Sequence, residues 1–323
     1  MQNSQPVILE AIYEQDFSDC SYGFRPGRSP HDALRDLRKR CLTEGVSWIV
    51  DADVSGYFDR IDRTQLREVL RRRVNDGSIM RLIGKWLRAG VMEEGVLHHP
   101  ETGVVQGGVI SPVLANVLLH HVLDAWFEQE VQPRLQGRSI LTRFADDFVI
   151  GCEWETDAQR IMAVLPKRFG RFGLSIHPEK TVMIKFRKPM ARMASGDGNG
   201  TFDFLGLTHY WARSRRGYWV IKRKTARKRL CRAKKSLWRW CRANRHLPLK
   251  DQHRMLCQKL RGHFQYYGIR GNSRKIAEVR YHVEEAWRYW LSRRSHKSAI
   301  SWEKFQKLKK VFVLPVPRIV HQL

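Results

Sequence analysis

Two short apolar runs flank a pair of adjacent aspartates near the middle of the chain. Residues 141–144 and 148–151 contain Leu, Phe, Val and Ile, and Asp146 and Asp147 lie between them. Short runs of this kind on both sides of turn residues predict a β-hairpin with the two aspartates at its turn. An ordinary Asp-containing turn is the alternative, because Asp is favoured in turns and an Asp-Asp pair occurs by chance in a chain of 323 residues.

A second carboxylate element lies in residues 48–54, where apolar and polar positions alternate with period two. One face carries Val50, Ala52 and Val54, and the other carries Ile49, Asp51 and Asp53. This pattern predicts a half-buried strand with its aspartates at the exposed end. Asp53 beside the Asp146-Asp147 turn would bring three carboxylates together, which repel one another unless a cation lies between them. Mg²⁺ prefers such oxygen ligands, and this arrangement is typical of two-metal nucleotidyl transfer.

A third element combines a glycine pair with a helix start. Gly107 and Gly108 allow a ligand to approach the backbone closely. Ser111 is a good N-cap and Pro112 suits the first helical position. The helix that follows, over residues 113–127, is apolar almost all round and is predicted to be buried under the sheet.

Elsewhere the apolar spacing predicts amphipathic helices connected to further strands. Asp62 or Thr64 is expected to cap the helix that follows it. Residues 174–176 and 181–184 are expected to pair as two strands across the turn at His177. Strands interleaved with helices predict an α+β fold with a mostly antiparallel sheet. The remaining predicted helices cover residues 30–40, 79–89, 158–172, 225–242 and 273–291.

The charge balance points to a polyanionic partner. Lys and Arg number 59 against 32 Asp and Glu, so the net charge is +27, which favours nucleic acid. A basic membrane-surface protein is the alternative, but no apolar stretch approaches membrane-spanning length and the first residues lack the features of a signal peptide. None of the six cysteines lies in a Cys-x-x-Cys pair, so no structural zinc site or zinc nuclease module is expected. Reduced thiols favour a cytoplasmic location, bacterial or organellar.

The basic residues concentrate in the C-terminal third. No acidic residue occurs between Asp203 and Asp251, and Trp238 and Trp240 are interleaved with the cations. A solvated helix face is the ordinary interpretation of such a run, but a single-signed run with aromatics favours phosphate binding. The expected RNA-binding residues are Arg223, Lys224, Arg227, Lys228, Lys235 and Arg239. The tryptophans of residues 273–291 fit the core stripe of their helix and are expected to pack.

Three of these elements occur together in the order and spacing of a reverse transcriptase palm. They are Asp-Val-Ser-Gly-Tyr-Phe-Asp at 53–59, Gln-Gly-Gly-Val-Ile-Ser-Pro at 106–112 and Phe-Ala-Asp-Asp at 144–147. The chain resembles the group II intron-encoded reverse transcriptase/maturase family. Residues 262–272 resemble the maturase-domain signature of that family. Further similar stretches are 21–29, 173–181 and 202–207.

The resemblance implies roles for individual residues. Asp53, Asp146 and Asp147 would hold two Mg²⁺ ions. Phe58, five positions after Asp53, matches the aromatic residue that discriminates against a 2′-hydroxyl. The nucleotide pocket would be lined by Gln106 and Gly107. Lys180 is a candidate for protonating the leaving pyrophosphate, with an ordinary surface lysine as the alternative. Asp51 and Asp59 are expected to be structural.

The resemblance also implies an architecture and a function. Residues 1–212 would form the palm with partial fingers, since the chain begins after most of the family's N-terminal fingers region, and residues 213–323 an all-α thumb/maturase domain. The expected function is an RNA-directed DNA polymerase that uses an intron RNA template, a DNA primer and deoxynucleoside triphosphates, and that assists splicing. One alternative is an RNA-binding splicing cofactor with a vestigial palm. Another is a basic nucleic-acid-binding protein without catalysis.

Overall fold

The structure is a computed structural model that describes residues 5–88, 91–93, 96–98, 110–190, 199–294 and 299–323. The chain forms two compact units. The first contains Met1–Leu205 and Arg215–Trp219, and the second contains Gly206–Ser214 and Val220–Leu323. The expected domain boundary at 212/213 falls inside a strand of the second unit and stays a prediction.

The first unit is built on a four-stranded antiparallel sheet. Its strand order is β4-β5-β1-β6. The predicted hairpin is present as β4 and β5, and the α+β fold with an antiparallel sheet is confirmed. The strands are β1 (Trp48–Ala52), β4 (Ser139–Phe144), β5 (Asp147–Cys152) and β6 (Val182–Lys185).

One strand pairing predicted from the sequence is wrong. Residues 174–176 and 181–184 do not pair with each other: β6 pairs with β1, and Ile176 forms a single bridge with Val54. Both segments therefore follow the same side of β1 and its extension. This arrangement gives hydrogen-bond partners to backbone groups of β1 that β5 does not reach.

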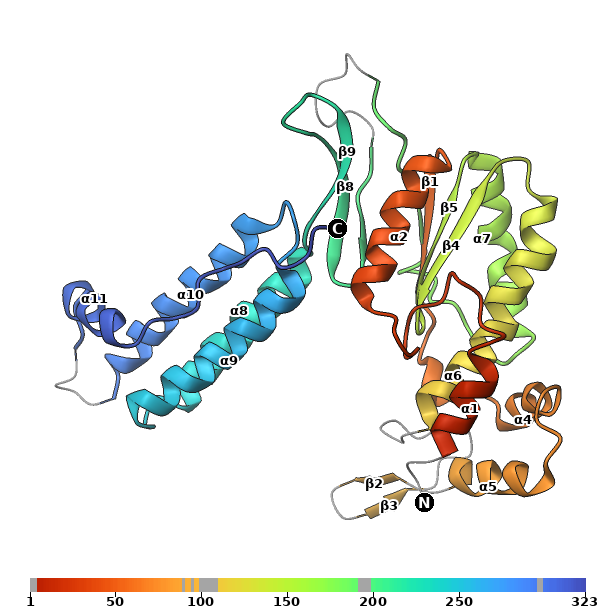
Figure 1. Ribbon diagram of the computed structural model, residues 1–323, viewed down its shortest axis with the longest axis horizontal. Coiled ribbons are helices and arrows are strands. Elements are labelled where there is room, and N and C mark those ends of the chain that lie inside the picture. Colours follow the sequence, from red (N-terminus) through yellow and green to blue (C-terminus); the bar gives the residue numbers. More distant parts are fainter. Residues whose placement is uncertain (1–4, 89–90, 94–95, 99–109, 191–198, 295–298) are drawn as a thin grey trace. The chain divides into compact units, whose positions relative to one another are not determined.

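Helices cover both faces of this sheet (Figure 1). The helix α2 (Pro30–Thr43) lies against β4 on one face, and α7 (Glu155–Gly170) packs on β1 and β5 on the other. Ile49 is fully buried, so the expectation that its face of β1 is exposed is wrong at this end of the strand. An isolated strand pattern could not show that a helix covers the second face. The α2 helix is well defined locally, because Ser29 and Asp32 form a capping box.

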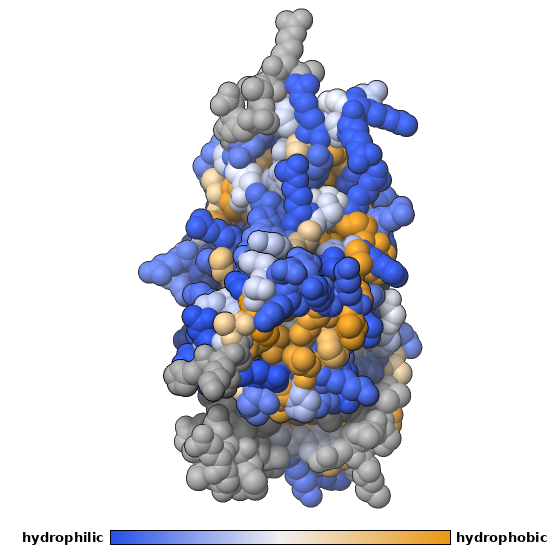
Figure 2. Space-filling model, turned by 90° about the vertical axis from the view of Figure 1, so that its left-hand side faces the viewer, coloured by the Kyte–Doolittle hydropathy of each residue, from blue (hydrophilic) through white to orange (hydrophobic). Residues whose placement is uncertain are grey.

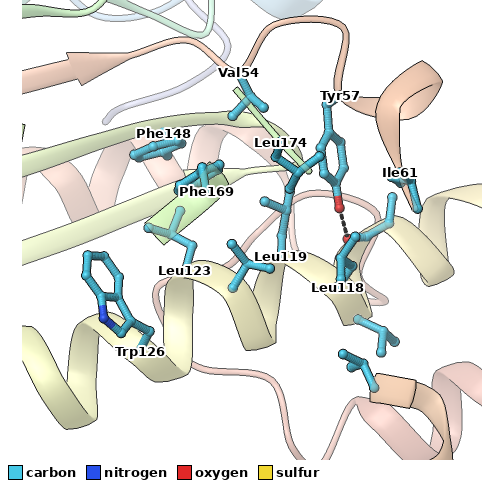
Figure 3. Close-up of a cluster of buried hydrophobic side chains, with 14 of the residues drawn as sticks. Val54, Tyr57, Ile61, Leu118, Leu119, Leu123, Trp126, Phe148, Phe169 and Leu174 are labelled. Atoms are coloured by element: carbon cyan, nitrogen blue, oxygen red, sulfur yellow. Dashed lines mark hydrogen bonds between the residues drawn. The ribbon is translucent and has the colours of Figure 1, made fainter. Parts of the chain in front are cut away.

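The predicted buried helix begins as α6 (Ser111–Leu119) and continues through π-type turns at His120–Asp124 and Phe127–Val131 to a short 3₁₀ turn at Gln132–Arg134. Ser111 is the first helical residue rather than the cap, and Ile110 precedes it. The helix is buried as expected. Figure 3 shows its leucines packed toward the sheet and α7, in a cluster that includes Leu119, Leu123, Phe148 and Phe169.

Shorter elements complete the first unit. The N-terminal helix α1 (Gln5–Tyr13) packs beside α6. Asp62 caps α4 by accepting hydrogen bonds from the backbone N–H groups of Thr64 and Gln65 at 2.7 and 3.0 Å, which settles the choice of cap. The other elements are α3 (Tyr57–Arg60), α4 (Arg63–Arg71), α5 (Gly77–Arg88), β2 (Val91–Glu93), β3 (Val96–His98) and β7 (Phe202–Phe204).

The second unit is mainly helical. Its core is formed by apolar residues from all four helices, and Trp287 is fully buried, with its indole N–H donating to Gln252 Oε1 at 2.9 Å. The prediction that this tryptophan packs in the core is confirmed. No helix among the described residues is long and apolar enough to span a membrane. The elements are β8 (Leu207–Arg213), β9 (Trp219–Thr225), α8 (Arg227–Ala243), α9 (Leu249–Tyr267), α10 (Ser273–Leu291) and α11 (Trp302–Val311).

Candidate active site and nucleic-acid interface

The predicted carboxylates lie at the same end of the central sheet. The β1–β5 register pairs Ala52 with Phe148, so Asp53 follows directly after the last pair, opposite Asp147. In the hairpin, Phe144 pairs with Asp147, and only Ala145 and Asp146 form the turn. The sequence pattern therefore predicted correctly that these elements converge, although the catalytic roles stay a prediction.

The hairpin turn has an unusual backbone conformation. Ala145 has a φ of +56°, in the left-handed region, which costs a residue with a β-carbon about 1–2 kcal/mol. Ala145 is buried, Asp146 is half-buried and Asp147 is exposed. The turn thus presents two consecutive carboxylates at different depths, and surrounding contacts must offset its conformational cost.

Lys180 lies against Asp53 from the β6 side. Its Nζ is 2.9 Å from Asp53 Oδ2. The backbone of Asp53 is fixed as well, because its carbonyl accepts from the N–H of His177 at 2.8 Å. Lys180 is therefore next to a predicted catalytic carboxylate rather than on a remote surface. Its role in proton transfer stays a prediction.

The acidic side chains influence one another's ionisation. Burial, together with the charges of Asp147, Asp203 and Asp53, raises the pKa of Asp51 to about 7. Burial also raises the pKa of Asp146, and Asp53 adds to this effect. Like charges that disfavour each other's ionised form favour a cation between them. Carboxylate oxygens of this kind fit a magnesium ion.

The carboxylates are not yet grouped as metal ligands. Within the described parts of the chain, no three or more His, Cys, Asp or Glu side chains are grouped so that they could hold a metal ion. The expectation of a metal-sized cluster is therefore not met in this structure, although Asp53 and the turn share one end of the sheet. Asp53 instead forms an ion pair with Lys180.

Asp203 is a neighbour of the site that the sequence reasoning did not select. It lies on β7 between Phe202 and Phe204, which are buried, while Asp203 is exposed. Its charge contributes to the raised pKa of Asp51. In the sequence, the only signal is the alternation of apolar and polar residues in Phe202, Asp203 and Phe204. This alternation does not show which other strand lies nearby.

Phe58 follows a firmly anchored residue. The hydroxyl of Tyr57 donates to the carbonyl of Ala115 at 2.6 Å (Figure 3), and Gly56 turns the chain with a φ of +54°. Phe58 is half-buried and packs edge-on against Tyr57, with ring centroids 5.5 Å apart. Its ring is thus held against Tyr57, and its role as a sugar gate stays a prediction.

Two predicted nucleotide-binding residues cannot be placed. Gln106 and Gly107 lie outside the described residues.

The predicted RNA-binding residues are mostly exposed. The exception is Arg223, which is only 2% exposed on β9. A buried guanidinium cannot reach an RNA phosphate, so the prediction for Arg223 is wrong. Strand alternation explains this, since Arg223 follows the buried positions Trp219 and Ile221 with period two. The exposed residues are Lys224, Arg227, Lys228, Lys235 and Arg239.

The aromatic residues on α8 are involved in packing. Trp238 lies 4.9 Å from Tyr289 and 5.8 Å from Trp290, measured between ring centroids, so it fills the contact between α8 and α10. Trp240 is half-buried, with the ammonium of Lys259 5.7 Å from its ring. The cations remain available for phosphate. Figure 2 shows hydrophilic side chains over much of one face of the molecule, around an apolar patch.

Comparison with known proteins identifies the class. A family model described as "Reverse transcriptase (RNA-dependent DNA polymerase)" matches residues 4–209. The chain therefore belongs to the reverse transcriptase family. The antiparallel sheet with its aspartate turn lies within the matched residues.

The curated proteins to which this chain is similar include a group II intron-encoded protein and an intron maturase. The group II intron-encoded protein LtrA of Lactococcus lactis subsp. cremoris is 40% identical over 122 residues, which are 38% of this chain and 20% of that protein. Protein YkfC of Escherichia coli is 36% identical over 143 residues, 43% of this chain and 36% of that protein. Nuclear intron maturase 1 of Arabidopsis thaliana is 37% identical over 82 residues, 25% of this chain and 11% of that protein. The matched regions thus span well under half of these relatives.

Solved structures support the fold. Apo telomerase from Candida tropicalis aligns with a TM-score of 0.53 at 14% identity, covering 96% of this chain and 52% of that one. A likeness at this identity supports the reverse transcriptase fold and nothing further.

Proposed function

We propose that this chain is an RNA-directed DNA polymerase that also binds and assists its intron RNA. The observation that carries this proposal is the position of Asp53 beside the Asp146-Asp147 turn, at one end of the sheet, in a member of the reverse transcriptase family. Three carboxylates in that arrangement suit metal-dependent nucleotidyl transfer.

Each residue at this end of the sheet has a proposed task. Asp53, Asp146 and Asp147 would hold two Mg²⁺ ions, which when bound activate a primer 3′-hydroxyl and neutralise the triphosphate. Phe58 would exclude a 2′-hydroxyl from the sugar position and so favour deoxynucleoside triphosphates. The ion pair between Lys180 and Asp53 would break when Asp53 binds the metal, and Lys180 would then donate a proton to the leaving pyrophosphate.

The RNA-binding part of the proposal rests on charge. Five of the six predicted cations are exposed on β9 and α8, and the intervening sequence is free of acidic residues. Lys and Arg side chains that neutralise phosphates release counterions, so the affinity would fall steeply with salt. The proposed partners are an intron RNA template, a DNA primer and deoxynucleoside triphosphates, and a cytoplasmic location stays a prediction.

One observation favours a second candidate function. Lys180 forms an ion pair with Asp53, and the acidic side chains of the described residues are not grouped for a metal. A palm in which this pair persists would bind RNA without synthesising DNA, as an RNA-binding splicing cofactor with a vestigial palm.

Primer extension on an RNA template distinguishes the two functions. The full chain is assayed with and without Mg²⁺, beside a filter-binding measurement of RNA affinity. Polymerase function predicts Mg²⁺-dependent extension together with RNA binding. RNA binding without extension at any Mg²⁺ concentration supports the splicing cofactor instead.

A further inference from the structure

Arg143 is a charged residue in the centre of the first unit. It lies on β4, three residues before Asp146, and its side chain is fully buried. Its guanidinium contacts Asp124 through Nε at 2.7 Å and through Nη2 at 2.5 Å. Nη2 also donates to Ser21 Oγ at 2.7 Å, and Nη1 donates to Asn116 Oδ1 at 2.9 Å. The proposed catalytic roles do not include any of these residues.

One further hydrogen bond of Arg143 reaches the hairpin turn itself. Nη1 donates to the carbonyl oxygen of Ala145 at 3.0 Å. Ala145 is the residue with the left-handed backbone, directly before Asp146. A planar guanidinium held on Asp124 therefore fixes the direction of the carbonyl that precedes the Asp146 N–H. Burial by itself would raise the pKa of Asp124, but the charge of Arg143 and the hydrogen bonds from His120 and Arg143 together outweigh burial and lower this pKa, so the carboxylate stays ionised.

A second segment braces the same turn from the side. The backbone N–H of Tyr22 donates to the carbonyl of Arg143 at 2.9 Å, and the N–H of Arg143 donates to the carbonyl of Cys20 at 2.8 Å. A β-carbon at Gly23 would lie 2.3 Å from the backbone nitrogen of Ala145. Only glycine therefore allows residues 20–24 to pass this close to the turn.

Asn116 connects the two supports. Its Nδ2 donates to the carbonyl of Gly23 at 2.6 Å, while its Oδ1 accepts from Arg143. Asn116 is itself buried on α6. One amide thus ties the glycine segment and the guanidinium to the helix beneath the sheet. The set of Arg143, Asn116, Asp124 and Gly23 is called the turn-support network below.

We infer that the turn-support network is a positioning device that holds Asp146 and Asp147 where a divalent cation can bind them. This inference rests on the proposed function, and it assigns a role to Arg143 and Asn116 as positioning residues. A lysine at position 143 cannot replace the arginine, because an ammonium lacks the planar fork that reaches Asp124 and the Ala145 carbonyl together.

The test compares Arg143→Lys with wild type in the full chain. Hydrogen exchange of the peptide amides at 144–148 reports the turn directly, Mn²⁺ titration followed by electron paramagnetic resonance reports metal affinity, and RNA affinity reports the rest of the molecule. Supporting residues around metal ligands typically contribute 10–100-fold in metal affinity or activity. We expect Arg143→Lys to weaken Mn²⁺ binding by about 10-fold or more and to speed exchange at the turn, with RNA affinity unchanged.

If Arg143→Lys does not fold, the same measurements are made on Asn116→Ala. It leaves the Arg143–Asp124 ion pair intact and removes the connection to Gly23. Asp157→Asn is the matched control. Asp157 is buried like Arg143, and its carboxylate accepts hydrogen bonds from the backbone N–H groups of Gln136 and Gly137. These two residues precede β4, at the end of the hairpin opposite its turn. This control is expected to lower thermal stability without altering turn exchange or Mn²⁺ affinity.

Two results would overturn the inference. One is wild-type exchange at residues 144–148 in both Arg143→Lys and Asn116→Ala. The other is an equal loss of turn protection in Asp157→Asn, which would show a general loss of stability. If the wild-type chain synthesises no DNA, the proposed function fails, whereas hydrogen exchange still decides whether the turn-support network holds the turn.

Discussion

Asp53 and Lys180, 127 residues apart in the sequence, form an ion pair of 2.9 Å at the end of the central sheet. The pair arises because β1 and β6 are neighbours, which brings the turn before β6 beside the end of β1. Lys180 therefore occupies the side of Asp53 away from the hairpin turn. A cation that binds Asp53 must compete with this ammonium.

The first prediction concerns Lys180→Gln. Removing the ammonium should lower the Mg²⁺ concentration needed for half-maximal extension, by less than about fivefold, because a partly exposed ion pair contributes about 0–1 kcal/mol. At saturating Mg²⁺, kcat should fall, since the proposed proton donor is lost. The measurement is primer extension against Mg²⁺ concentration. Lys185→Gln, at the far end of β6, is the control that should change neither value. An unchanged kcat in Lys180→Gln would remove the proton-donor role.

The second prediction concerns Phe58. Phe58→Ala should raise the incorporation of ribonucleotides relative to deoxynucleotides, because the half-buried ring would no longer block a 2′-hydroxyl. Single-nucleotide incorporation with each substrate gives the ratio. Phe58→Tyr keeps the ring and should keep the ratio close to that of wild type. A ratio that stays constant in Phe58→Ala would exclude Phe58 as the gate.

The third prediction concerns the basic surface of α8. Lys235→Gln/Arg239→Gln should weaken RNA binding and reduce the steepness of its salt dependence by about 0.7–0.9 for each phosphate contact removed. Lys304→Gln/Lys310→Gln removes the same charge from α11, where both side chains are also exposed. The two double variants are compared by RNA affinity at several salt concentrations. Equal effects would indicate a general charge effect and no α8 interface.

The fourth prediction concerns stability and pH. Burial, with the charge of Arg223, lowers the pKa of His209 to about 3 from 6.5. Below pH 6.5 the unfolded chain therefore takes up a proton at His209 that the folded chain does not. The contribution of His209 to the free energy of unfolding is fully present above pH 6.5 and decreases as the pH falls from 6.5 toward 3. The loss is about 1.4 kcal/mol for each pH unit in this window. His209→Phe should show a flatter decline in chemical unfolding free energy between pH 6.5 and 4.5, and a decline parallel to wild type would contradict this.

The sequence predicted those features that depend on local alternation. The hairpin around Asp146 and the strand before Asp53 follow directly from period-two patterns, and the apolar helix at α6 follows from its composition. Their convergence was a hypothesis from the aspartates in both elements, and the resemblance to a reverse transcriptase palm supported it. The pairing of residues 174–184 was wrong because it depends on which distant strand has a free edge.

Buried charges were the least predictable part of the site. Arg143 and Arg223 lie in strands, and an arginine by itself favours a surface position. Arg143 is buried together with its ion-pair partner Asp124, which is 19 residues away in the sequence. The support of the aspartate turn therefore became visible only in three dimensions.

In the proposed function, Asp146 and Asp147 are required for DNA synthesis, while the basic surface of α8 binds RNA separately. The direct test is Asp146→Asn/Asp147→Asn in the full chain, with primer extension on an RNA template and RNA affinity measured in parallel at several salt concentrations. Amides cannot replace carboxylates as magnesium ligands, so extension should be abolished while RNA affinity stays close to that of wild type. Extension that persists in the double variant, or RNA binding that is lost together with extension, would contradict the proposed function.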